Sequence, residues 1–245
     1  MQEFINALNE AKQQIDTCNN NFIGLFLYGS QNYGLSHKNF DYDFICLVID
    51  TDNGMPFNIV RYKYSQIKIY NLGILRNYLV KGDLECLEIL TTEYNYLNPV
   101  YEDIVKDLCK SIDAFTSDDK VKEALSKKLK EHIEYLEYIT KKELGFFYNK
   151  KRLYWAIRVK EQLQQMLAGK SFTESLHCPE RLVEELLSIK TGKTCITKQE
   201  YKNKKDELYS FIMALPDFKC LDNPDKFIVI RNFIYNIRSK ECTLV

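Results

Sequence analysis

Two short, almost wholly apolar runs lie close together near the start of the chain and constrain its fold more than any other feature. They are FIGLFLY at 22–28 and the apolar part of DYDFICLVI at 41–49. Both are too short for a stable helix and are rich in aromatic and branched residues, which is typical of buried strands. The segment FNIVRYKYSQIKIYNL at 57–72 adds one or two strands, with a turn expected at Lys63 and Tyr64. A small sheet covered on its faces therefore opens the fold.

Helical spacing of apolar residues dominates the rest of the chain. Residues 2–19 predict an amphipathic helix, and no strand is expected after residue 73. Breakers such as Asn-Pro and Gly-Lys divide that region into helical runs at 73–81, 83–91, 99–112, 118–168, 179–190, 197–214 and 224–239. We predict an α+β fold: a small mixed sheet flanked by helices in residues 1–115, followed by an all-helical C-terminal region in residues 116–245.

Composition excludes several classes of protein. The chain has 34 Lys and Arg residues and 34 Asp and Glu residues, so no net field favours nucleic acid or a membrane surface. No segment approaches 18 uninterrupted apolar residues, and we expect a cytoplasmic protein without a membrane partner. The eight cysteines are scattered without a Cys-x-x-Cys pair, which favours reduced thiols over disulfides or a zinc site.

A candidate for chemistry lies where the first two strands meet. The strand at 22–28 ends at Gly29, where a missing side chain allows a tight turn and the close approach of a phosphate. Ser30 adds an N–H and a hydroxyl. Asp41 and Asp43 alternate by two, so they point to one face of the next strand. Two such carboxylates repel unless a divalent cation lies between them, which predicts Mg²⁺ or Mn²⁺ holding a nucleoside triphosphate.

These residues resemble the signature of a known group of enzymes. Gly29-Ser30, ten residues and then Asp41-Tyr42-Asp43 is similar to the motif of the nucleotidyltransferase superfamily typified by DNA polymerase beta, in its minimal bacterial branch. Similarity to predicted nucleotidyltransferases of bacteria and phages extends over YGSQNYGL (28–35), IKIYNLGILRNYLVKGDLECLEIL (67–90), LNPVYEDI (97–104) and KKRLYWAIRVKEQLQQMLAGKSF (150–172). The resemblance implies transfer of a nucleoside monophosphate to a hydroxyl of an RNA end, a protein or a small molecule. In the alternative interpretation, Gly29-Ser30 is a simple turn, and Asp41 and Asp43 are solvated residues at the edge of the sheet.

The pattern departs from the superfamily in its third carboxylate. Between Arg61 and Gly82 there is no Asp or Glu, and the inward candidates on that strand are Gln66, Lys68 and Tyr70. The third acid would then come from Asp50, Glu85 or Glu88, although the last two lie at i, i+3 and also fit a solvated helix face. The alternative is a catalytically degenerate protein that binds a nucleotide or regulates a partner.

A basic helix carries the second departure. The family's Lys, His and Arg on one face correspond here to Lys151, Trp155 and Arg158. The resemblance implies that Lys151 and Arg158 bind phosphates, and Trp155 could stack on a base. The alternative makes Trp155 a core residue and the two cations surface residues. The sequence indicates neither the acceptor nor the oligomeric state.

Overall fold

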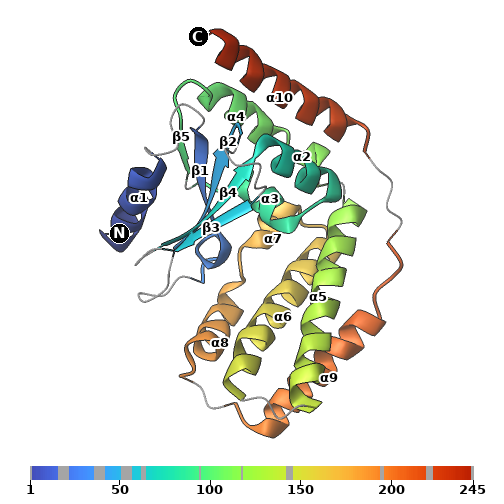
Figure 1. Ribbon diagram of the computed structural model, residues 1–245. Helices are drawn as coiled ribbons and strands as arrows, with labels where there is room; N and C mark the ends of the chain where they lie inside the picture. Colours follow the sequence, from blue (N-terminus) through green and yellow to red (C-terminus); the bar gives the residue numbers. More distant parts are fainter. Residues whose placement is uncertain are drawn as a thin grey trace. The chain divides into compact units, whose positions relative to one another are not determined.

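A computed structural model describes residues 2–15, 22–35, 42–50, 57–61, 65–93, 95–116, 118–141, 146–193, 196–218 and 223–243. Its contacts group the chain into two compact units (Figure 1). The sheet unit comprises Met1–Asn32, Ser36–Ser117 and Asp222–Val245, and the helical unit comprises Tyr33–Leu35 and Asp118–Leu221.

A five-stranded mixed sheet organises the sheet unit. The strands are β1 (Phe22–Tyr28), β2 (Tyr42–Val48), β3 (Phe57–Arg61), β4 (Ser65–Asn71) and β5 (Asn95–Leu97), in the order β3-β4-β2-β1-β5. The β2 and β4 strands are parallel, and the other neighbours are antiparallel. In this register Tyr28 lies opposite Asp43, and Asp43 lies beside Gln66.

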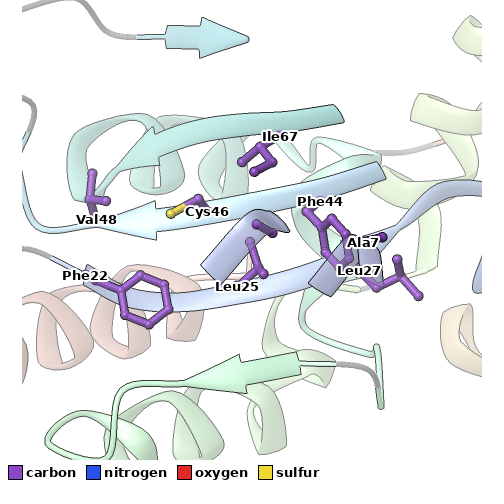
Figure 2. Close-up of a cluster of buried hydrophobic side chains, with 9 residues drawn as sticks. Ala7, Phe22, Leu25, Leu27, Phe44, Cys46, Val48 and Ile67 are labelled. Carbon is purple, nitrogen blue, oxygen red and sulfur yellow. The ribbon is translucent and has the colours of Figure 1, made fainter. Parts of the chain in front are cut away.

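The two faces of the sheet have different side chains, because residues alternate along each strand. One face packs against α1 (Gln2–Ile15) and forms a buried apolar cluster (Figure 2) that includes Ala7, Ala11, Phe22, Leu25, Leu27, Phe44, Cys46, Val48 and Ile67. Lys68 and Tyr70 point to the opposite face, where they contact α2 (Leu72–Lys81) and α3 (Leu84–Ile89). The first face is apolar where it packs against α1, whereas the polar side chain of Lys68 lies on the second.

The last helix of the chain belongs to the sheet unit. Helix α10 (Asp225–Thr243) packs along α2 and along α4 (Glu102–Lys110), which precedes the short turn η3 (Ile112–Ala114). The buried Lys226 donates from Nζ to the carbonyl of Val80 at 3.2 Å, and Arg238 pairs with Asp50 at 2.7 Å. The expected helical region 116–245 therefore differs from the observed units at its C-terminal end. Independent folding of two domains stays a prediction.

The helical unit is built around two long helices. They are α5 (Asp118–Lys141) and α6 (Phe146–Leu167), which pack together, while α8 (Glu180–Thr191) and α9 (Lys198–Met213) pack on α6. The short α7 (Phe172–Leu176) and α9 both begin with a capping box, from Ser171 and Thr197 respectively. Tyr33 joins this unit by accepting a hydrogen bond from the N–H of Cys178 at 3.1 Å. None of the helices in the described ranges is long and apolar enough to cross a bilayer.

The expected α+β fold is confirmed, with two corrections to its elements. The strand at 22–28 has its expected bounds, and the segment 57–72 forms two strands, while the turn residues Lys63 and Tyr64 lie outside the described residues. The expectation of no strand after residue 73 was wrong, because β5 pairs with β1. The long run 118–168 contains two helices, α5 and α6, rather than one.

Candidate functional site

The turn after β1 brings Gly29 against the carboxylate of Asp43. Gly29 has a φ of +84°, a left-handed conformation that favours glycine. A Cβ at this position would lie 3.3 Å from Oδ2 of Asp43 and would crowd it. Ser30 follows and is buried at 8% exposure. The sequence therefore needs glycine here for two reasons, the backbone conformation and the space beside Asp43.

A buried glutamate holds this turn in place. Glu88 of α3 is only 2% exposed, and its Oε1 accepts the N–H of Gly29 at 2.5 Å and Nδ2 of Asn32 at 3.1 Å. Asn32 also donates to the carbonyl of Leu27 and accepts from Thr92 Oγ1, each at 3.0 Å. The solvated-face interpretation is wrong for Glu88. The N–H of Gly29 donates to a carboxylate of the protein itself, and a phosphate role for Gly29 and Ser30 stays a prediction.

Helix α3 also supplies a second carboxylate on the side of the sheet where Lys68 lies. Oε2 of Glu85 is 2.5 Å from Nζ of Lys68 and 3.4 Å from the hydroxyl of Tyr70. Lys68 Nζ also lies 4.8 Å from the ring centroid of Tyr28. Asp83 begins α3 by accepting the N–H groups of Glu85 and Cys86, both at 3.1 Å, which fixes where Glu85 leaves the backbone. Lys68, which the sequence predicted to lie on this face, therefore neutralises Glu85.

Tyr28, the last residue of β1, is buried opposite Asp43. Burial raises its pKa far above the ordinary value, and the negative charges of Asp43, Glu85 and Glu88 add to the rise. The Tyr28 hydroxyl therefore keeps its proton at neutral pH. The pKa of Tyr70 is raised in the same way, by burial and then by Glu85. Tyr28 was not among the residues predicted from the sequence, although its place next to Gly29 could have indicated it.

Three residues were candidates for a third acid: Asp50, Glu85 and Glu88. Helix α3 brings Glu85 and Glu88 to the face of the sheet where Lys68 lies. Asp50 follows the far end of β2 and is engaged by Arg238, whose hydrogen bond lowers the pKa of Asp50. Glu88 is committed to the turn through Gly29 and Asn32. Glu85 is 43% exposed and remains accessible from solvent.

The predicted metal centre depends on Asp41 as well as Asp43. Asp41 lies outside the described residues. Within the ranges that the structure describes, no group of three His, Cys, Asp or Glu side chains is placed to hold a metal ion. Carboxylate oxygens such as those of Asp43 and Glu85 are the donors that Mg²⁺ and Mn²⁺ prefer. The donor chemistry fits these cations, and the ion itself stays a prediction.

The basic residues predicted to bind phosphate lie on α6 of the helical unit. Lys151 is exposed, whereas Arg158 is buried at 7% exposure against the ring of Tyr33. The half-buried Trp155 makes edge contacts with Tyr33 and Tyr154, at centroid distances of 6.1 Å and 5.2 Å, as a core residue would. Lys151 and Arg158 therefore differ in environment, although they were expected to share one face.

Comparisons with known proteins leave the family of this chain open. No protein-family model matches it, and no curated protein matches it significantly. Among solved structures, a nucleotidyltransferase-like protein from Exiguobacterium sibiricum aligns with 94% of this chain and 79% of its own length. That alignment has 11% identity and a TM-score of 0.35, too weak a similarity to support an argument about fold or function.

Proposed function

We propose that this protein is a metal-dependent nucleotidyltransferase that moves a nucleoside monophosphate from a triphosphate to a hydroxyl. The observation that supports the proposal is the closeness of Gly29 to Asp43, because a Cβ at residue 29 would lie 3.3 Å from Oδ2 of Asp43. Gly29 of the Gly-Ser pair and the second aspartate of Asp-x-Asp therefore lie together where β1 ends and β2 begins. A motif of this kind has catalytic meaning only if its turn and its carboxylate meet in space.

In this proposal Asp43 and Asp41 would hold Mg²⁺ or Mn²⁺, and the Gly29-Ser30 turn would lie beside the phosphates. The cation would supply charge neutralisation on the phosphates during transfer. The acceptor oxygen forms a bond to the α-phosphorus, the bond from the α-phosphorus to the bridging oxygen breaks, and pyrophosphate leaves with the electron pair of that bond. The acceptor hydroxyl loses its proton to a base. Glu85 is the described carboxylate best suited to this role, because it is accessible and its partner Lys68 lies on the same face of the sheet as Asp43.

A second function is favoured by one specific contact. The ammonium of Lys68 lies 2.5 Å from Glu85, so a fixed positive charge of the protein neutralises the acid that would otherwise act as base or ligand. A chain in which this ion pair persists would bind a nucleotide through its phosphates without transferring it. In this second function the protein is a catalytically degenerate nucleotidyltransferase that acts as a nucleotide-binding or regulatory module.

The two functions separate in one assay. The full chain is incubated with triphosphates labelled at the α-phosphate, Mg²⁺ or Mn²⁺, and either an RNA oligonucleotide with a free 3′-hydroxyl or the protein alone as acceptor. The transferase incorporates label and releases one pyrophosphate for each nucleotide incorporated, and Asp43→Asn abolishes both. Saturable triphosphate binding by calorimetry without incorporation into either acceptor would instead support the binding module.

A further inference from the structure

Asp43 and Lys68 lie on the same face of the sheet, on neighbouring parallel strands. Asp43 of β2 pairs in register with Gln66 of β4, and Ile45 of β2 pairs with Lys68. Residues that pair across strands share a face, so Lys68 is displaced by two residues along β4 from the partner of Asp43. For ordinary strand spacing this diagonal is about 8 Å between the Cα atoms. A long side chain at residue 68 can therefore reach the space beside the carboxylate of Asp43.

The ammonium of Lys68 has a defined position on this face. Its Nζ lies 2.5 Å from Oε2 of Glu85 and 4.8 Å from the ring centroid of Tyr28. Tyr28 in turn lies directly opposite Asp43 in the register of β1 and β2. The Lys68 side chain is only 15% exposed, and burial restricts the rotamers that a lysine can take. Lys68 is therefore a fixed positive charge beside the candidate metal centre.

The acids near Lys68 are poorly suited to hold a second divalent ion. Transfer with two metal ions requires ligands that serve both ions. The strand β4 has the sequence SQIKIYN and supplies no acid. Glu88 accepts the N–H of Gly29 and an amide N–H of Asn32, and Glu85 is already neutralised by Lys68. The ammonium of Lys68 would also repel a divalent ion placed next to it.

We propose that the ammonium of Lys68 takes the place of one of the two divalent ions, so that the centre holds a single ion, at Asp43. This role of Lys68 rests on the proposed function, because it concerns the metal centre of the same transfer. An ammonium carries its own charge and needs no cluster of carboxylates to hold it, which fits a strand without an acid. Lys68 then supplies the charge of the second ion, whereas in the binding module it only blocks Glu85.

The transfer step balances with Lys68 in this role. The acceptor hydroxyl gives its proton to the carboxylate of Glu85, and the acceptor oxygen forms its bond to the α-phosphorus. The bond from the α-phosphorus to the bridging oxygen breaks, and pyrophosphate leaves with that electron pair. Because Nζ of Lys68 lies 2.5 Å from Glu85, its ammonium can donate a hydrogen bond to the negative charge that develops on the acceptor oxygen, and it gives up no proton.

The test counts the Mn²⁺ ions bound to the full chain by equilibrium dialysis, with a saturating triphosphate analogue whose bond between the α- and β-phosphates cannot be cleaved. The analogue prevents turnover, so the count does not depend on activity. Free analogue equilibrates across the membrane, and only Mn²⁺ held by the protein is counted. We expect about one ion per wild-type chain. Two ions per chain, or none, would overturn the proposal.

Lys68→Asp places a carboxylate where the ammonium was and releases Glu85. The count should rise from about one to about two Mn²⁺ ions per chain. Lys106→Asp is the matched control, because Lys106 of α4 also pairs with a glutamate, Glu102, at 2.6 Å, and the change in charge is the same. Its count should stay at about one, and equal counts for the two variants would overturn the proposal. Circular dichroism checks that each variant folds, and the wild-type count decides if Lys68→Asp does not.

The transfer rate at saturating Mn²⁺ gives a second readout. Lys68→Met should lower this rate about 10²-fold, because one preorganised group that stabilises developing charge contributes on that scale. Lys68→Arg keeps a positive charge and should lower the rate less than Lys68→Met. Equal rates for wild type and Lys68→Met would overturn the role of Lys68 in transfer.

Incorporation of label decides the proposed function separately from the ion count. Transfer by a wild-type chain that binds two Mn²⁺ ions would refute the role of Lys68 and leave the proposed function standing. One ion in wild type and two in Lys68→Asp, without transfer to either acceptor, would refute the transferase and keep Lys68 in the place of the second ion.

Discussion

The ammonium of Lys68 on β4 lies 2.5 Å from the carboxylate of Glu85 on α3. This pair places a positive charge on β4, the strand on which the sequence resemblance leads us to expect a third acid, and Glu85 of α3 brings an acid to that charge. Whether Glu85 acts in catalysis or only neutralises Lys68 is the question that divides the two proposed functions.

Glu85→Gln should lower the rate of nucleotide transfer about 10²-fold or more, because a general base contributes on that scale. The measurement is the initial rate of label incorporation at saturating Mn²⁺. The matched control is Asp50→Asn, since Asp50 pairs with Arg238 at the far end of β2 and should keep the wild-type rate. Equal rates for Glu85→Gln and wild type would remove Glu85 from the reaction.

Lys68→Met should release Glu85 and make the site more negative. The concentration of Mn²⁺ needed for half-maximal activity should then fall by about 3- to 10-fold, because a neighbouring cation no longer opposes the metal. Metal titrations of the transfer rate measure this shift. An unchanged or higher metal requirement would mean that Lys68 does not oppose metal binding.

Glu88→Leu should destabilise the fold. The change leaves the N–H of Gly29 and one donor of Asn32 without their buried acceptor, at a cost of about 2–4 kcal/mol in the free energy of unfolding. Glu88→Gln keeps an acceptor oxygen and should cost only about 1 kcal/mol. Urea unfolding of both variants measures the difference. Equal stabilities of the two variants would contradict the role of Glu88 in holding the turn.

Gly29→Ala should impair both stability and the site. The left-handed backbone costs about 1 kcal/mol for alanine, and the new Cβ crowds Oδ2 of Asp43. Gly192→Ala is the matched control, because Gly192 has a similar φ of +71° but nothing within 4 Å of an added Cβ. Both variants should lose stability through the left-handed backbone, Gly29→Ala should lose at least as much as Gly192→Ala, and only Gly29→Ala should lose nucleotide transfer.

His132 predicts a pH dependence of stability. Burial, with Arg152 nearby, lowers the pKa of His132 to about 4, below its ordinary value near 6.5. The unfolded chain therefore binds more protons between these values, and stability is lost as the pH falls from about 6.5 to 4. His132→Gln should reduce this loss of stability. Between pH 6.5 and 4, the midpoint temperature of unfolding should fall by about 2–6 °C less in the variant than in wild type. The exposed His177→Gln should keep the wild-type pH dependence.

Much of the sheet could be predicted from the sequence, because its strands are short apolar runs between breakers. Strand β5 could not, because Asn95–Leu97 is only three residues long and becomes a strand through its pairing with β1. The burial of Glu88 could not be predicted from the local sequence pattern either. A glutamate three residues from Glu85 on a helix has the spacing of a surface pair, and only the turn at Gly29 explains why it is buried. The grouping of α10 with the sheet likewise follows from tertiary contacts.

The most direct test of the central claim is Mn²⁺ binding without nucleotide, measured by electron paramagnetic resonance on wild type and Asp43→Asn. The claim is that a divalent cation binds at the carboxylate beside Gly29. We predict that wild type removes Mn²⁺ from solution saturably and that Asp43→Asn loses this binding while keeping its fold. Equal Mn²⁺ binding by the two proteins, or none by wild type, would contradict a metal site at Asp43.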